Sequence, residues 1–100
     1  MRLTAEQTAT ILSLVHRQLG PDVRIRVYGS RLNDRVKGGD LDLLVESPHR
    51  ITRLQRAELT MLLETELQIP VDILAYQHGT EPNAFQAIAL AQAIPLERAA

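Results

Sequence analysis

The chain lacks cysteine and tryptophan, and it has only two tyrosines and one phenylalanine among 100 residues. The absence of cysteine excludes disulfide bonds, thiolate zinc sites and cysteine nucleophiles. Because aromatics are scarce and hydrophobic residues still make up 45% of the chain, the core must consist mainly of leucine, isoleucine, valine and alanine. A chain of this length is near the common size of one folding unit, so we expect a single domain over residues 1–100.

The chain also lacks an excess of charge of one sign, because it has 11 Lys and Arg residues and 12 Asp and Glu residues. Affinity for nucleic acid comes largely from accumulated basic residues, so direct nucleic-acid binding is not expected. No apolar run approaches a membrane span, and the N-terminal segment has no uninterrupted apolar stretch of the kind that signal peptides carry. We therefore expect a cytoplasmic protein without membrane contact. The three histidines show no zinc-binding spacing.

Helical and strand patterns alternate along the chain. A capping-box pair, Thr4 and Gln7, opens a helix that Gly20 and Pro21 end. Alternating apolar residues predict strands at 23–28, 40–46 and 71–75, and helical periodicity predicts helices near 51–67 and 81–93, the last capped by Thr80. A short helix at 31–36 is a further candidate. This order predicts an α/β fold (α+β by some schemes), a small mixed β-sheet flanked by helices whose strand order stays open.

Each helix is expected to bury one apolar stripe. The expected core positions are Ile11, Leu12, Val15 and Leu19 in the first helix, Leu54, Ala57 and Met61 in the second, and Phe85, Ile88 and Ala89 in the third.

Three aspartates lie inside apolar strand patterns. Asp40 and Asp42 flank Leu41, so on a strand they point to one face with Cα atoms about 6.7 Å apart. Asp72 lies in a later apolar strand, and if the two strands are neighbours the three carboxylates meet. Such crowding is unfavourable unless cations neutralise it, which predicts a divalent metal site. The alternative is a turn at Asp40 and solvent-facing aspartates on edge strands.

The pair Gly29-Ser30 follows the first strand. Glycine lets the backbone approach a phosphate closely, and the N–H groups of a helix start attract anions. Arg31 would offset phosphate charge through charge-assisted hydrogen bonds. The alternative is a plain turn with Ser30 as a helix cap and Arg31 on a solvated surface.

Together, Gly29-Ser30, the Asp40-x-Asp42 pair and Asp72 resemble the nucleotidyltransferase superfamily typified by DNA polymerase β. At this length the chain is similar to the minimal nucleotidyltransferases (MNT), which are often encoded beside HEPN-domain partners as toxin–antitoxin pairs.

The resemblance implies the nucleotidyltransferase fold and a role for each motif residue. Asp40 and Asp42 would bind the catalytic divalent ions, two Mg²⁺, and Asp72 would complete the triad and help to activate the acceptor hydroxyl. Gly29 and Ser30 would hold the triphosphate of ATP. The reaction would transfer AMP to an acceptor hydroxyl, and in MNT antitoxins the expected acceptor is a tyrosine of the HEPN toxin.

The chain departs from the commonest family pattern at Asp34, where many relatives carry glycine. An acidic side chain near a triphosphate is repulsive unless it turns outward. Two alternatives therefore stay open: a binding module that masks its partner by contact alone, and nucleotidyl transfer to a small molecule or RNA. Homo- or hetero-oligomerisation could complete a site from two chains.

Overall fold

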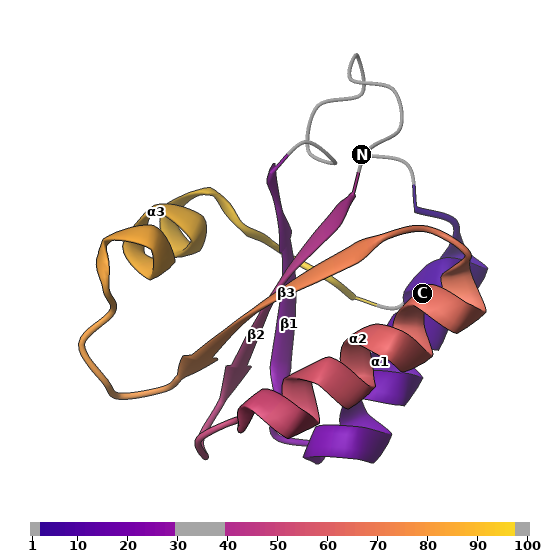
Figure 1. The fold of residues 1–100 in the computed structure, drawn as a ribbon. Helices are drawn as coiled ribbons and strands as arrows, with labels where there is room; N and C mark the ends of the chain where they lie inside the picture. The colour runs from indigo at the N-terminus through magenta and orange to yellow at the C-terminus, as the bar shows by residue number, and fades with distance from the viewer. Residues whose placement is uncertain (1–2, 30–39, 98–100) are drawn as a thin grey trace.

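The computed structural model describes residues 3–29 and 40–97. In chain order the elements, drawn in Figure 1, are α1 (Ala5–Leu19), β1 (Arg24–Tyr28), β2 (Leu41–Ser47), α2 (Arg53–Leu67), β3 (Val71–Gln77), α3 (Ala84–Gln92) and β4 (Ile94–Pro95). The helix expected at 31–36 lies outside the described residues. Within the described ranges, no helix is long and apolar enough to cross a membrane.

The strands form one mixed sheet in the order β3-β2-β1-β4. β1 runs antiparallel to both of its neighbours, while β2 and β3 are parallel because α2 carries the chain back between them. The mixed sheet was predicted. The two-residue strand β4 was not, since it contains Pro95, a residue that sheets tolerate mainly at an edge.

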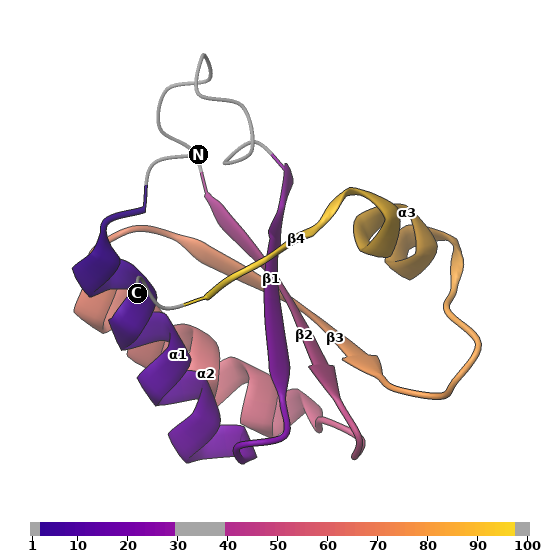
Figure 2. The same cartoon turned by 180° about the vertical axis from the view of Figure 1, so that it is seen from behind.

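Figures 1 and 2 show α1 and α2 side by side on one face of the sheet and α3 on the other. The main core lies under α1 and α2, and its fully buried members are Ile11, Val15, Val27, Leu41, Leu43, Val45, Leu59 and Leu63. As the composition predicted, this core contains no aromatic ring.

The capping motifs set where the helices begin. Thr4 and Gln7 form the predicted capping box of α1. The same reciprocal hydrogen bonds recur in α3, where Asn83 is the cap instead of the expected Thr80. Helix α3 therefore begins at Ala84, three residues later than predicted, because the Asn83 side chain accepts from the Gln86 N–H at 2.7 Å.

The buried stripe expected for α1 is confirmed, whereas the stripe expected for α2 is wrong. Leu54 and Met61 are each 68% exposed, while Leu59 and Leu63 are fully buried. The α2 sequence offers two apolar stripes, one through Leu54, Ala57 and Met61 and one through Leu59 and Leu63. Packing against α1 selects the second stripe, and no local pattern distinguishes the two.

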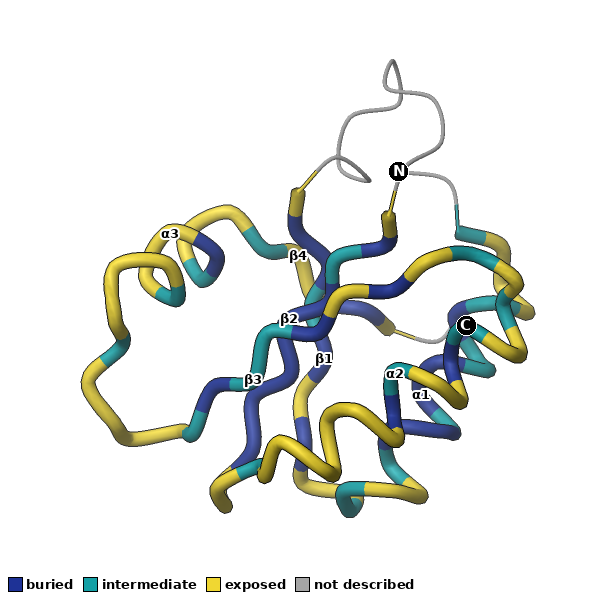
Figure 3. The backbone as a smooth tube through the Cα atoms, viewed as in Figure 1, coloured by how far each residue is buried: buried dark blue, intermediate teal, exposed yellow. Residues whose placement is uncertain are grey.

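The buried side of α3 was predicted correctly only at Ala89. Phe85 and Ile88 are 58% and 57% exposed, because α3 rests on the sheet through smaller residues near its C-terminus. Ala89, with Leu90 and Ala93 beside it, packs against a second cluster that contains Tyr28, Leu44 and Tyr76. Figure 3 shows the resulting contrast between the buried strands and the largely exposed α3.

Candidate functional site

Tyr28, Asp42 and Asp72 lie in one row across the sheet. Tyr28 in β1 is the register partner of Asp42 in β2, and Asp42 is the register partner of Asp72 in β3. Register partners share a face of the sheet and lie about 4.8 Å apart across the strands. The strand-neighbour condition set by the sequence is therefore met, and Asp42 and Asp72 lie side by side.

This row lies on the α3 face of the sheet, because side chains alternate along β2. Leu41 and Leu43 are fully buried against α1 and α2, whereas Asp42 between them points the other way and is half-buried. Asp72 and Asp40 are exposed. Both apolar neighbours of Asp42 are needed for the core on one face, so the strand can carry the carboxylate only on the opposite one.

Asp42 and Tyr28 feel the negative charges of the neighbouring aspartates. Burial raises the pKa of Asp42, and the negative charges of Asp72 and Asp40 raise it further. Burial, followed by the charges of Asp42 and Asp72, raises the pKa of Tyr28 to about 12. Tyr28 is therefore a neutral phenol at physiological pH, and the neighbouring carboxylates disfavour the charged form of Asp42.

Gly29 ends β1 directly against Asp42. Its φ of 80° lies in the left-handed region that favours glycine. A Cβ at this position would overlap Oδ2 of Asp42 and approach its Cγ to 3.1 Å. Glycine is thus required here for close packing against the carboxylate, in addition to any contact with phosphate. Ser30 and Arg31, the other two expected nucleotide contacts, lie outside the described residues.

The donor set suits Mg²⁺ held jointly with a nucleotide. Among residues 3–29 and 40–97, no group of three or more His, Cys, Asp or Glu side chains could hold a metal ion alone. Mg²⁺, however, is usually held by one or two carboxylates together with substrate phosphates. Asp42 and Asp72 are adjacent hard oxygen donors whose mutual repulsion a cation would relieve. The residues therefore fit an ion shared with bound phosphates.

An exposed aromatic ring lies beside the Tyr28 end of this row. Phe85 of α3 meets Tyr28 edge-on, with ring centroids 6.4 Å apart and an interplanar angle of 79°. Tyr28 itself is buried at the end of β1. Tyr76 near the end of β3 is also buried and donates its hydroxyl to the Thr80 C=O at 2.6 Å.

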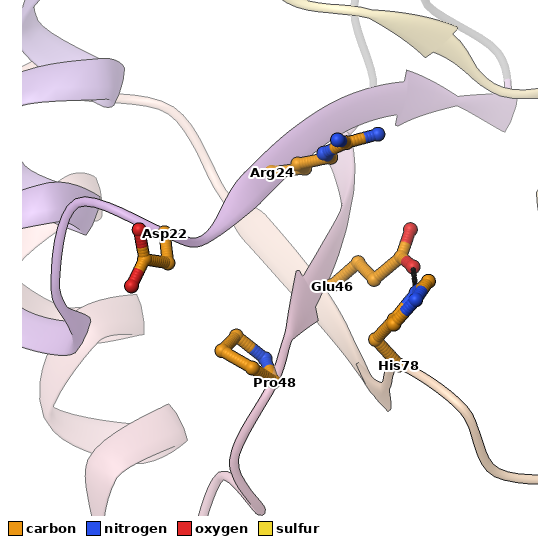
Figure 4. A pocket seen from close by; sticks show the side chains of 5 residues that line it. All are labelled: Asp22, Arg24, Glu46, Pro48 and His78. Atoms are coloured by element: carbon orange, nitrogen blue, oxygen red, sulfur yellow. Dashed lines mark hydrogen bonds and ion pairs between the residues drawn. The ribbon is translucent and has the colours of Figure 1, made fainter.

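A second polar cluster lies at the other end of the same face and was not predicted. Glu46 is the fourth residue after Asp42 along β2, and its side chain is only 10% exposed. It accepts from Arg26 Nη1 at 2.7 Å and lies 2.5 Å from Nδ1 of His78, the contact drawn in Figure 4. Asp22, Arg24 and Pro48 complete the lining of a 330 Å³ pocket around this pair.

The Glu46 cluster joins residues 20 and 32 positions apart, which no local pattern connects. Burial alone would raise the pKa of Glu46. The hydrogen bonds and positive charges of His78 and Arg26 outweigh burial, and the pKa of Glu46 is lowered. The one available signal was the period of two along β2, which places Glu46 on the same face as Asp42.

Comparison with known proteins identifies the fold. Residues 10–94 match the nucleotidyltransferase domain family. A solved structure provisionally described as a minimal nucleotidyltransferase is 31% identical, with a TM-score of 0.68, and the match covers 95% of this chain and 98% of that one. No curated protein sequence matches the chain.

Two further solved structures share the fold at lower identity. One is a tri-AMPylated Shewanella oneidensis HEPN toxin in complex with MNT antitoxin, at 18% identity and a TM-score of 0.71, covering 96% of this chain and 74% of that one. The other is a toxin–antitoxin complex with AMP-PNP, at 18% identity and a TM-score of 0.71, covering 97% and 75%. The family match and the similarity over the whole length show that this chain belongs to the nucleotidyltransferase domain family and has the minimal nucleotidyltransferase fold.

Proposed function

We propose that the protein is a Mg²⁺-dependent nucleotidyltransferase that moves AMP from ATP to an acceptor hydroxyl, a tyrosine of a HEPN-domain toxin. The observation that carries this proposal is the row of Tyr28, Asp42 and Asp72, in which two carboxylates are adjacent and Asp40 acts electrostatically on Asp42. Because the substrate is ATP, the proposed location is the cytoplasm.

The similar structures support the choice of nucleotide and acceptor. One contains a tri-AMPylated HEPN toxin with an MNT antitoxin, and another contains the ATP analogue AMP-PNP. A third is a MntA–HpeT mutant in which two aspartates, separated by one residue, are replaced by glutamate. That spacing is the spacing of Asp40 and Asp42 in this chain.

In the proposed site, Asp42 and Asp72 would hold Mg²⁺ together with phosphate oxygens, and Asp40 would contribute its carboxylate from the start of β2. The ion would supply charge neutralisation and alignment for an in-line displacement. Gly29, Ser30 and Arg31 hold the triphosphate at the end of β1. Repulsion from Asp72 and Asp40 contributes to the raised pKa of Asp42, and a bound cation would relieve that repulsion.

The reaction balances as a simple substitution at phosphorus. The acceptor hydroxyl oxygen bonds to the α-phosphorus of ATP, the bond from that phosphorus to the bridging oxygen breaks, and pyrophosphate leaves. The hydroxyl proton passes to a carboxylate oxygen of Asp72, the most exposed end of the row. Tyr28 is buried and neutral, so it does not serve as the proton acceptor.

The test incubates the purified chain with Mg²⁺, α-labelled ATP and a lysate of its host. Label on a discrete protein is expected, and Asp42→Asn should lower the labelling by at least about 100-fold, because it removes charge that stabilises the transition state. Asp22→Asn, the same change at an exposed loop position, is the matched control and should label normally.

Undiminished labelling by a folded Asp42→Asn protein would overturn the proposal. Label on RNA would move the acceptor to nucleic acid. If no nucleotide is transferred and the chain still neutralises its partner in cells, masking by contact alone becomes the function.

A further inference from the structure

Strand β3 is an edge of the sheet, and half of its backbone groups point away from β2. Leu41 N–H donates to the Pro70 C=O at 2.9 Å, and His78 N–H donates to the Ser47 C=O at 2.8 Å. Backbone groups alternate in direction along a strand, so the even-numbered residues of β3 point to β2 and the odd-numbered residues point outward. The outward groups belong to Val71, Ile73, Ala75 and Gln77.

The outward backbone groups at both ends of this edge already have hydrogen-bond partners in side chains and in a turn. Glu64 Oε2 accepts from the Val71 N–H at 2.8 Å, and Gln86 Nε2 donates to the Ala75 C=O at 3.1 Å. Thr80 N–H donates to the Gln77 C=O. Between them, the Val71 C=O, both groups of Ile73 and the Ala75 N–H have no partner among the described residues. This is the donor and acceptor set that one short added strand requires.

A groove of about 430 Å³ lies beside the open part of this edge, between β3 and the first half of α2. It is lined by Arg53, Arg56, Ala57, Thr60, Met61, Val71, Asp72 and Ile73. The two arginines are exposed, and neither has an ion-pair partner within residues 3–29 and 40–97. Met61, 68% exposed, adds apolar surface. The groove thus combines free backbone groups, two uncompensated positive charges and an apolar patch.

We propose that this groove docks an extended segment of the acceptor protein as a fifth strand on β3, with acidic residues directly before and after the modified tyrosine. The inference rests on the proposed function and specifies the substrate of the same site. An added strand extends the row of Tyr28, Asp42 and Asp72 by one position, which places its side chain about 4.8 Å from Asp72 across the strands.

The acidic flanks follow from the alternation of side chains. A tyrosine in the row points to the α3 face, so the residues on either side of it point to the α2 face. There they meet Arg53 and Arg56, which line the groove without acidic partners. Alternating backbone donors and acceptors favour a polypeptide over RNA, because an RNA backbone offers phosphates to the arginines and no matching donors and acceptors to Ile73.

The test uses two fluorescein-labelled peptides of identical composition, without nucleotide or metal. In Thr-Val-Glu-Tyr-Glu-Val-Thr the glutamates flank the tyrosine, and in Thr-Glu-Val-Tyr-Val-Glu-Thr they lie one position further out. We expect the first peptide to bind at least about tenfold more tightly by fluorescence anisotropy, and to slow amide hydrogen exchange at Ile73 and Ala75. The double variant Arg53→Glu/Arg56→Glu should remove the preference.

The charge-matched control is Arg17→Glu/Arg24→Glu, which reverses two exposed arginines away from the groove and should keep the preference. Equal affinity for the two peptides, or a preference that survives in Arg53→Glu/Arg56→Glu, would overturn the proposal. A ten-nucleotide single-stranded RNA that displaces the peptide and depends on the same arginines would assign the groove to nucleic acid. Because no nucleotide is present, these outcomes are independent of AMP transfer.

Discussion

Two carboxylates four residues apart on β2 face the same side of the sheet in opposite electrostatic settings. Asp42 lies among like charges, and its pKa is raised. Glu46 lies between Arg26 and His78, and its pKa is lowered. Asp42 is half-buried and Glu46 is buried, and burial raises the pKa of both, so the opposite directions come from the side chains that lie beside each position.

Glu46 and Asp42 differ in whether the described structure supplies a partner for the carboxylate charge. Glu46 already has the Arg26 guanidinium and the His78 ring as hydrogen-bond partners, so its charge is compensated within the described structure. Among residues 3–29 and 40–97, Asp42 has carboxylates and a neutral phenol as neighbours, so no cationic partner for its charge lies in the described part of the chain. A carboxylate with a raised pKa and no cationic partner among the described residues is a candidate for a functional site. The three predictions below test this comparison, from the largest expected effect to the smallest.

Gly29→Ala, which places a methyl group against Asp42, should have the largest effect on stability and activity. The new Cβ would overlap Oδ2 of Asp42, and alanine disfavours the φ of 80° at this position. We expect a loss of roughly 2–3 kcal/mol in the free energy of unfolding by urea titration, and a loss of AMP transfer as well. The control is Gly79→Ala, at a φ of 87° with open space around the Cβ, which adds no clash. Equal losses in the two variants would show that the contact with Asp42 is unimportant.

Substitution by amides should change stability in opposite directions at the two positions. Glu46→Gln removes a charge that Arg26 and His78 pair with, and should lower the free energy of unfolding by roughly 1–3 kcal/mol. Asp42→Asn removes repulsion from Asp72 and Asp40, and should raise the melting temperature. Thermal unfolding of both variants, without metal, measures the two changes in stability. A loss of stability in Asp42→Asn would contradict the idea that its charge is unsatisfied.

The pH dependence of stability should also have opposite signs. The folded pKa of Asp42 lies above its ordinary value of 3.8, so its contribution is fully present below that value and is lost as the pH rises through the folded pKa. The folded pKa of Glu46 lies below its ordinary value of 4.5, so its contribution is present above pH 4.5 and is lost as the pH falls through the folded pKa.

Urea unfolding between pH 3 and 7 measures both contributions as differences between the wild type and the two amide variants. The wild-type advantage over Glu46→Gln should grow as the pH rises towards 4.5. The wild type should lose stability relative to Asp42→Asn as the pH rises above 3.8. If the two stability differences changed with pH in the same direction, the conclusion that Asp42 and Glu46 have neighbours of opposite charge would be wrong.

Much of the fold followed from local patterns. The capping box of α1, the strand that ends at Tyr28 and the apolar strand around Asp42 were all predicted, because hydrogen-bond capping and the period of two are encoded within a few residues. The grouping of Asp42 with Asp72 was predicted conditionally and depended on the two strands being neighbours. The register supplies that condition.

The failures share one cause. Leu54 and Met61 were expected to be buried because they form a valid helical stripe, yet α1 packs on the other stripe of α2. Phe85 was expected in the core because it is large and apolar, yet α3 contacts the sheet through Ala89 and its neighbours. Where a helix carries two possible stripes, the partner selects one, and the partner is distant in sequence.

The sequence by itself determined the three helices and the three longer strands, the capping box of α1, the mainly aliphatic composition of the core and the presence of aspartates in strands that otherwise bury leucine and valine. Only the tertiary structure decided which charges are neighbours. The pairing of β2 with both β1 and β3 places Asp72 beside Asp42, and the same pairing brings Arg26 and His78 to Glu46. Electrostatic interactions depend on distances through space, and those distances exist only after strands far apart in the chain have been aligned.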